Sequence, residues 1–172
     1  MTDRLFVGVL GHQHAGKTTT WSTLFGGANV RTGQYPRPLM LYGGECVDVF
    51  LVNGSPQERG RKAKEILQHQ GCRIVLCSIQ YSEAVRETLD YITEEKFDMF
   101  VQWLNPGRHD ADKNSDTLGL MPWLLDHNAT VSVRDGKIDA GGRTEEIRQF
   151  IHGWAKARQL VFACQSGGGC GD

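Results

Sequence analysis

The sequence predicts an α/β fold, a three-layer α/β/α sandwich with a mostly parallel sheet and one antiparallel hairpin strand. Short apolar runs alternate along the chain with stretches whose apolar residues recur at helical spacing. This alternation is typical of parallel strands joined by right-handed helical crossovers. Two further apolar runs, 39–42 and 46–52, are separated only by Gly43 and Gly44, which predicts the antiparallel hairpin.

The other elements follow from the same patterns. The apolar run 5–10 predicts a buried first strand, and 19–25 predicts a short helix that ends at Gly26–Gly27. After the hairpin we expect a helix over 57–69, a strand over 73–77, a helix over 82–95 and a strand over 97–104. An irregular stretch over 105–116 leads to a helix over 118–125, which Gly119 and Pro122 interrupt. A strand over 129–134 and a final helix capped by Thr144 complete the domain. Residues 1–164 are predicted to form one domain, and residues 165–172 a flexible glycine-rich tail.

Composition excludes some functions. The chain has 172 residues and a formal net charge of −1, so no overall field attracts nucleic acid or an anionic membrane. The sequence shows no signal peptide before the first strand, and no apolar stretch long enough to span a bilayer. We therefore expect a cytoplasmic protein without nucleic-acid or membrane partners.

The five cysteines argue against a disulfide framework, because their number is odd and no secretion signal is present. Cys46, Cys72 and Cys77 lie in apolar runs, which predicts buried side chains. Cys164 and Cys170 flank the glycine-rich tail. They could bind a metal or form a redox pair, but their spacing matches no strong ligand pattern, which favours an unstructured terminus.

The chemistry is concentrated in one motif. Residues 11–18 fit the pattern G-x-x-x-x-G-K-[ST], in which backbone N–H groups bind phosphate oxygens. Lys17 is expected to reach the β- and γ-phosphates, and the Thr18 hydroxyl to bind Mg²⁺. The side chains of His12 and His14 could touch phosphate or point away from it. The predicted nucleotide-binding residues are Gly11, His12, Gln13, His14, Ala15, Gly16, Lys17, Thr18 and Thr19.

With this motif, the chain resembles the P-loop NTPase superfamily, and within it a divergent GTPase-like domain of the translation-factor or small-GTPase type. Residues 11–19 begin Gly-His and end Gly-Lys-Thr-Thr, as the translation-factor loop commonly does. A hairpin after the first helix is also typical of GTPases. Residues 53–59 occupy the place of switch II, whose pattern is Asp-x-x-Gly-Gln-Glu. The resemblance implies a nucleotide-binding domain that holds Mg²⁺ with ATP or GTP.

The switch II and metal-binding positions depart from that family. Asn53 replaces the aspartate that orders the Mg²⁺ shell, so its neutral amide offers weaker metal support. Pro56 has no N–H to give the γ-phosphate. Gln57 falls where a water-orienting glutamine would lie, so it is a candidate catalytic residue beside Lys17; it could equally be a solvated residue of a helical first turn. Thr32 lies where GTPases place a Mg²⁺-binding threonine, which makes Thr18, Asn53 and Thr32 the candidate metal ligands.

The guanine-specificity motif Asn-Lys-x-Asp is degenerate. Asn105 matches its first residue and is a candidate base-binding residue, but the lysine and the aspartate are missing. ATP is therefore slightly favoured over GTP. Each of Arg31, Arg37 and Arg59 could act as an arginine finger or be a surface charge.

Three functions remain open from the sequence. The first is a Mg-nucleotide-binding protein that acts as a slow NTPase or a nucleotide-dependent switch. The second is a small-molecule or nucleotide kinase, in which the basic residues of 59–62 would meet a phosphorylated acceptor. The third is a catalytically inactive nucleotide-binding module that presents a surface to a protein partner.

Overall fold

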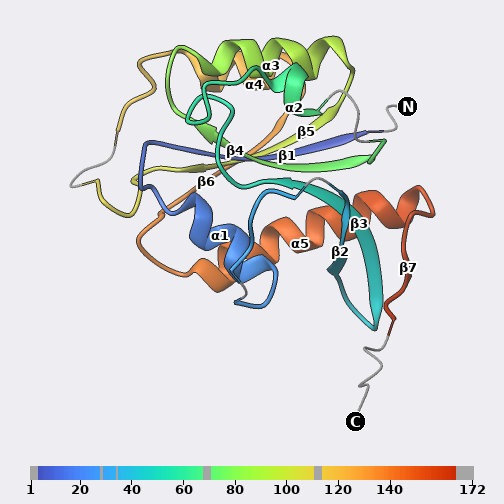
Figure 1. Ribbon diagram of the computed structural model, residues 1–172. Helices are drawn as coiled ribbons and strands as arrows, with labels where there is room; N and C mark the ends of the chain where they lie inside the picture. Colours follow the sequence, from blue (N-terminus) through green and yellow to red (C-terminus); the bar gives the residue numbers. More distant parts are fainter. Residues whose placement is uncertain (1–3, 28, 34, 68–70, 111–113, 166–172) are drawn as a thin grey trace.

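The protein has an α/β architecture built on a seven-stranded sheet (Figure 1). The computed structural model describes residues 4–27, 29–33, 35–67, 71–110 and 114–165. The strands are β1 (Leu5–Gly11), β2 (Arg37–Met40), β3 (Glu45–Val52), β4 (Ile74–Gln80), β5 (Asp98–Leu104), β6 (Thr130–Arg134) and β7 (Phe162–Ala163). The helices are α1 (Lys17–Leu24), α2 (Ala63–Leu67), α3 (Val85–Glu94), α4 (Leu120–Asp126) and α5 (Ala140–Ala157).

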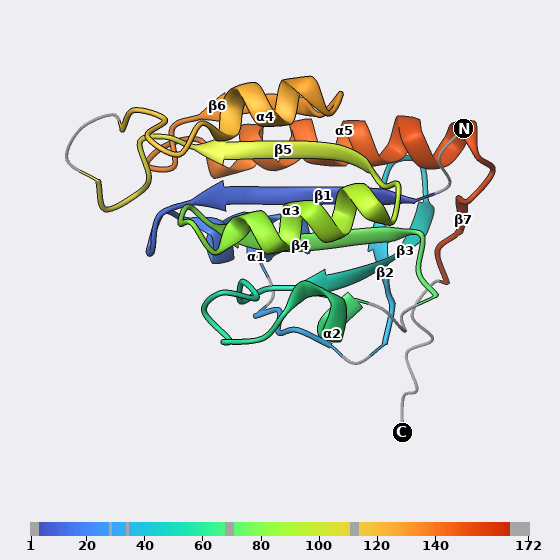
Figure 2. The same ribbon diagram turned by 90° about the horizontal axis from the view of Figure 1, so that it is seen from above.

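The sheet is mostly parallel, with the order β2-β3-β4-β1-β5-β6 (Figure 2). β1 lies between β4 and β5, and all three run parallel. The predicted hairpin is confirmed, because β2 pairs antiparallel with β3. β7 adds a second antiparallel partner to the start of β3, which the sequence did not predict. Because β4 separates β1 from β3, the loops that follow β1 and β3 lie two strands apart at the same end of the sheet.

Helices lie on both sides of the sheet, with α2, α3 and α4 on one side and α1 and α5 on the other (Figure 1). Alternate residues of β1 enter two separate cores. Phe6 and Leu10 belong to the cluster that includes residues of α2, α3 and α4, whereas Val7 and Val9 belong to the cluster that includes residues of α1 and α5. Burial of both faces explains why β1 reads as a continuous apolar run.

The final helix begins earlier than predicted. α5 starts at Ala140, where Asp139 is the cap and its Oδ1 accepts the N–H of Gly142 at 2.9 Å. The prediction of Thr144 as the cap is wrong, because Thr144 lies buried inside the helix and its hydroxyl bonds the Ala140 carbonyl. An aspartate offers a strong cap, and the two glycines that follow it concealed the helix start in the sequence.

The helix predicted over 57–69 is shorter in the structure, where α2 covers only Ala63–Leu67; residues 68–70 lie outside the described part. Turns occupy residues 56–60. Gly60 has a φ of 60°, a left-handed conformation that interrupts a helix. α4 begins after Gly119, so Pro122 falls in its first turn, where a missing N–H leaves no helical bond unmade.

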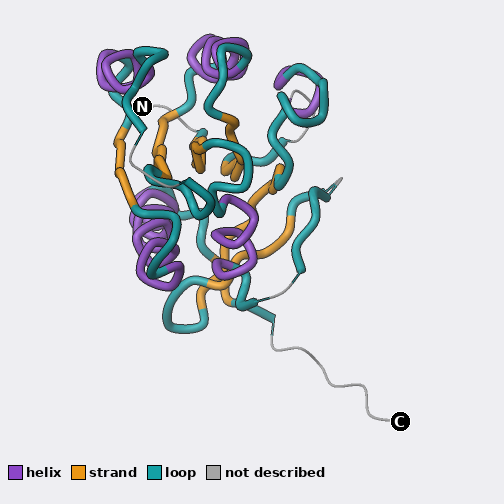
Figure 3. Tube along the Cα trace, turned by 90° about the vertical axis from the view of Figure 1, so that its left-hand side faces the viewer, coloured by secondary structure: helices purple, strands orange, loops and turns teal. Residues whose placement is uncertain are grey.

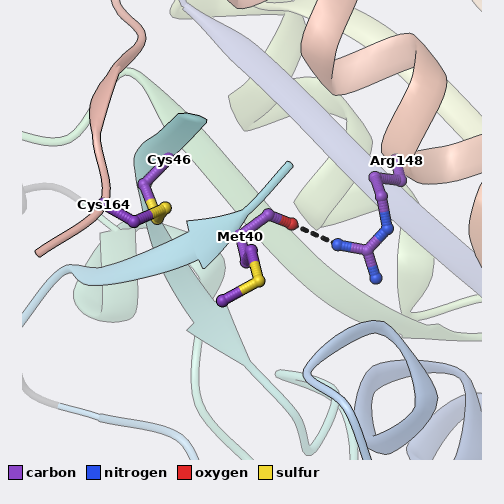
Figure 4. The surroundings of a disulfide bond; sticks show 4 residues. All are labelled: Met40, Cys46, Arg148 and Cys164. Carbon is purple, nitrogen blue, oxygen red and sulfur yellow. Dashed lines mark hydrogen bonds between the residues drawn. A yellow bond between two sulfur atoms is a disulfide. The ribbon is translucent and has the colours of Figure 1, made fainter. Parts of the chain in front are cut away.

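A disulfide joins Cys46 to Cys164, so the expectation that the chain lacks disulfides is wrong (Figure 4). An odd cysteine count does not exclude a single pair, and β7 carries Cys164 to the start of β3. The predicted burial of Cys46, Cys72 and Cys77 is confirmed. Cys170 and most of the predicted tail lie outside the described residues. None of the helices in the described ranges is long and apolar enough to cross a membrane.

Candidate functional site

The segment 11–18, here called the glycine loop, connects the end of β1 to the start of α1. His14 and Gly16 have φ values of 60° and 108°, so the loop turns back through left-handed backbone. Gly16 precedes α1 without any side-chain cap. The first N–H groups of a helix have no carbonyl partner within it, and those of Lys17, Thr18 and Thr19 are therefore available to an anion.

Two glycines from other loops fix the position of the glycine loop. Gly107 follows β5 and Gly136 follows β6, and both lie against Ala15. The N–H of Arg108 donates to the Ala15 carbonyl at 2.9 Å, and the N–H of Gly136 donates to the Pro106 carbonyl at 2.8 Å. A Cβ atom added at Gly136 would lie 2.3 Å from the Ala15 oxygen, so only glycine permits this approach.

A cleft of about 740 Å³ opens beside the glycine loop, at the end of the sheet that faces the viewer in Figure 3. It brings together most of the predicted site. The lining residues are Gln13, His14, Ala15, Gly16, Lys17, Thr18, Thr19, Arg31, Thr32, Asn53, Gly54, Glu58, Arg59, Arg108 and His109. Four predicted residues are not among them, namely Gly11, His12, Gln57 and Asn105.

Lys17 is buried against the base of the glycine loop, with 6% of its surface exposed. Its ammonium donates to the carbonyls of Gly11 at 3.0 Å and His12 at 2.8 Å. Burial lowers the pKa of Lys17, and the charges of Glu58 and Asp110 offset part of that effect. Lys17 therefore places a positive charge at the wall of the cleft, and a bound phosphate would stabilise the protonated form of its ammonium.

The candidate metal ligands come from α1, from the segment before β2 and from the segment after β3. Thr18 is exposed to the cleft from α1. Asn53 donates its side-chain N–H to the Val30 carbonyl at 2.7 Å and its backbone N–H to the Thr32 hydroxyl at 2.9 Å. The Oδ1 atom of Asn53 is buried and has no hydrogen-bond partner in the described structure, so an oxygen acceptor is left to face a cation or a bound water.

These oxygens fit Mg²⁺ held mainly by a ligand. No cluster of three or more His, Cys, Asp or Glu side chains suited to a metal ion occurs in the part of the chain that is described. Mg²⁺ usually keeps few protein ligands and completes its octahedron with phosphate oxygens and waters. One threonine hydroxyl and one amide oxygen suit that mode of binding.

Gln57 points away from the cleft. Its amide donates to the Thr88 hydroxyl on α3 at 2.8 Å. Its neighbour Glu58 lines the cleft instead. Sequence reasoning missed Glu58, although the pattern Ser-x-x-Glu over 55–58 is a capping-box signal. The Ser55 N–H donates to Glu58 at 3.0 Å, and the Glu58 N–H donates to the Ser55 hydroxyl at 3.1 Å.

Asn105 shapes a loop and is not part of the cleft wall. Its amide exchanges two hydrogen bonds with the backbone of Asn114, at 2.7 and 2.9 Å. Arg108 and His109 of the same loop line the cleft, and no sequence signal indicated them. Of the three candidate arginine fingers, Arg31 and Arg59 line the cleft and Arg37 does not.

Gln80 links two parts of the site and was also missed. It ends β4 and lies in register with Gly11 of β1. In one orientation of its amide, Gln80 accepts the Lys17 ammonium at 3.3 Å. With the amide turned over, it instead donates to Glu58 at 3.0 Å and accepts the N–H of Gln13 at 3.2 Å. The signal that could have found it is its place at the carboxyl end of a buried parallel strand, where ligand-binding residues gather in such sheets.

Comparisons of the chain with protein-family models, with curated proteins and with solved structures find no match. The resemblance to P-loop NTPases therefore depends on the residues of the glycine loop and on the order of the elements around it.

Proposed function

We propose that the chain is a P-loop protein of the three-layer α/β/α type that binds a Mg-nucleoside triphosphate in the cleft and acts as a slow NTPase or a nucleotide-dependent switch. One observation carries the proposal. The segment Gly11–Thr18 matches a phosphate-binding motif at every fixed position, and it joins a buried parallel strand to an uncapped helix. Lys17 and the first amides of α1 would hold the phosphates.

Thr18 and Asn53 would hold Mg²⁺ together with the phosphate oxygens, and Thr32 supports Asn53 through the bond to its backbone. When bound, Mg²⁺ supplies positive charge that neutralises the β- and γ-phosphate oxygens. Thr32 is a less direct ligand than the sequence suggested, because its hydroxyl oxygen also accepts from Arg59 at 2.5 Å.

The base is proposed to be adenine slightly ahead of guanine. A guanine-specific pocket needs a carboxylate that accepts from the base N1–H and N2–H₂ groups. Among the described residues that line the cleft, Glu58 is the single carboxylate, and it is bonded to Ser55 beside the glycine loop. The Asp110 carboxylate nearby accepts from the Gly107 N–H at 2.7 Å and from Asn114.

Calorimetry and thermal melting of the full chain with Mg-ATP and Mg-GTP test the proposal. Saturating ligand at a hundred times its dissociation constant adds about 2.7 kcal/mol of stability, so binding raises the melting temperature with concentration. Lys17→Met should abolish that rise and any phosphate release. Lys64→Met, which removes an exposed lysine of α2, is the matched control and should change neither. No heat and no melting shift with any Mg-nucleotide would refute the function.

The same assay separates the two alternatives. Arg59 lines the cleft, where its charge could bind the phosphate of an acceptor molecule, and this supports the kinase alternative. A kinase would consume Mg-ATP only when such an acceptor is added. Gln57 is bonded to α3 and so is not placed to orient a water in the cleft, which supports the alternative of an inactive module that serves a protein partner. Such a module would bind Mg-nucleotide tightly and release no phosphate.

A further inference from the structure

We propose that Glu58 is the catalytic residue that takes the proton from the attacking water, in place of Gln57. This assignment rests on the proposed function, because it concerns the hydrolysis of a nucleotide bound in the cleft. Glu58 was not among the residues that the sequence indicated.

The charge distribution of the cleft singles out Glu58. Its lining includes four cationic side chains, Lys17, Arg31, Arg59 and Arg108, and one carboxylate, Glu58, among the described residues. The cations suit the phosphates, whereas a carboxylate repels them, so Glu58 is not a phosphate-binding residue. Water is the partner that a carboxylate can bind and deprotonate at this place.

The Glu58 carboxylate is held in a fixed place. Its Oε2 accepts the Ser55 N–H at 3.0 Å. When the Gln80 amide turns its nitrogen toward Glu58, the Oε1 atom of Glu58 accepts that N–H at 3.0 Å. Each carboxylate oxygen has room for a second hydrogen bond, because an ionised carboxyl accepts about four. Glu58 is exposed, so water reaches those remaining positions.

Gln80 ties that carboxylate to the phosphate-binding backbone. In the orientation in which it donates to Glu58, the amide accepts the N–H of Gln13 in the glycine loop at 3.2 Å. In the other orientation it accepts the Lys17 ammonium at 3.3 Å. The Glu58 charge is also near enough to Lys17 to raise the pKa of its ammonium against the effect of burial. The Gln80 amide therefore lies between the Glu58 carboxylate and the part of the glycine loop that would hold the terminal phosphate.

Gln57 cannot play this part from its observed place. Its Nε2 donates to the Thr88 hydroxyl at 2.8 Å, and its Oε1 is buried with no hydrogen-bond partner among the described residues. Reorienting the Gln57 amide toward the cleft would break the hydrogen bond from Nε2 to Thr88 of α3.

The step balances with water as the only co-reactant. The water oxygen forms a bond to the γ-phosphorus, and one water proton passes to a Glu58 oxygen. The bond between the γ-phosphorus and the β–γ bridging oxygen breaks, and its electron pair leaves with the nucleoside diphosphate. Inorganic phosphate departs, and Glu58 returns its proton to solvent.

Glu58→Gln in the full chain tests the assignment. The variant keeps an oxygen that can accept the Ser55 N–H but cannot take a proton. Glu65→Gln makes the same chemical change at an exposed position on α2 and is the control. We measure single-turnover phosphate release from Mg-ATP and, separately, the rise in melting temperature that Mg-ATP causes.

We expect Glu58→Gln to lower the hydrolysis rate by about 10²- to 10⁴-fold, the usual contribution of a general base, while the melting shift stays at the wild-type value. Glu58→Asp, which keeps a carboxylate on a shorter stem, should hydrolyse at least about tenfold faster than Glu58→Gln. Glu65→Gln should match the wild type in both measurements.

Four results would overturn the assignment. The first is hydrolysis by Glu58→Gln within about threefold of the wild-type rate, and the second is loss of nucleotide binding together with turnover in that variant. The third is a wild-type protein that binds Mg-nucleotide without hydrolysing it, which overturns the catalytic role and leaves the binding function standing. A wild-type protein that binds no nucleotide overturns both.

Discussion

Gly136→Ala tests the most exacting contact of the site, where a loop after β6 lies against the glycine loop. A Cβ atom at this position would lie 2.3 Å from the Ala15 carbonyl oxygen and 3.2 Å from the Arg108 nitrogen. Both neighbours are backbone atoms, so they cannot rotate away as a flexible side chain would. The backbone of Gly136 or of the glycine loop has to move.

The expected loss is about 1.5–4.5 kcal/mol of unfolding free energy. Forcing one methyl group into a filled space costs about 1–3 kcal/mol. The added atom also lies beside the Ala15 oxygen, so the hydrogen bond from the Arg108 N–H at 2.9 Å is displaced, with a net cost of about 0.5–1.5 kcal/mol. Because the shift involves Ala15, the amides at the start of α1 move with it, and the affinity for Mg-ATP should fall as well.

Urea unfolding of the full chain measures the first effect, and the Mg-ATP melting shift measures the second. Gly153→Ala is the matched control, because Gly153 lies within α5 with nothing within 4 Å of its added Cβ. That change should stabilise the protein by about 0.5–1 kcal/mol through helix propensity and leave the ligand shift unaltered. If Gly136→Ala unfolds within about 0.5 kcal/mol of the wild type and keeps the ligand shift, the close packing of the loops is refuted.

Three further predictions concern stability. Lys17→Met should raise the unfolding free energy by about 1 kcal/mol in urea titrations without nucleotide, because burial disfavours the charged ammonium and lowers its pKa. The two carbonyls that Lys17 bonds would still accept backbone N–H groups, from Tyr81 and from Ala15. A clear loss of stability would contradict this prediction. Reduction of the Cys46–Cys164 disulfide, which spans 118 residues, should cost about 2–5 kcal/mol by the same method, and a chain with serine at both positions should not respond to the reductant. Complete burial raises the pKa of Cys77 from 9.0 to about 12, so between these pH values the thiol is ionised in the unfolded state and still protonated in the folded state. The unfolding free energy should therefore fall by up to about 1.4 kcal/mol per pH unit between pH 9 and 12. The Cys77→Ala variant should lack this added pH dependence.

Much of the strand pattern was predictable because strands covered on both faces must be apolar throughout. Runs such as 5–10 and 97–104 therefore marked β1 and β5 almost to the residue. The sheet order was not predictable in the same way. Nothing local in β4 indicates that it inserts between β3 and β1, since that choice depends on packing between distant segments. β7 was missed because its two residues are both exposed and carry no burial pattern.

The site was predictable where its geometry is local. The glycine loop needs only its own glycines and the strand and helix beside it, and the structure places Gln13 to Thr19 together in one cleft. The roles of Gln57 and Glu58 were harder to separate. Which of two adjacent side chains faces the cleft is decided by the Ser55–Glu58 hydrogen bonds and by the contact of Gln57 with α3, and a family motif carries neither fact.

The cellular location stays a prediction. A cytoplasmic protein was expected on the ground that no secretion signal was read, but disulfides persist mainly in oxidising compartments. The Cys46–Cys164 pair therefore makes the redox state of the chain an experimental variable.

The crosslink also divides the chain topologically. Cys46 and Cys164 close a covalent ring that contains β4, β5, β6 and α5, whereas β1 precedes Cys46 and lies outside it. Yet β1 is the strand between β4 and β5. If oxidation comes first, the N-terminal segment that carries the glycine loop has to pair with β4 and β5 after both have become part of a closed ring. If the sheet assembles first, oxidation only joins Cys46 of β3 to Cys164 after the strands have paired.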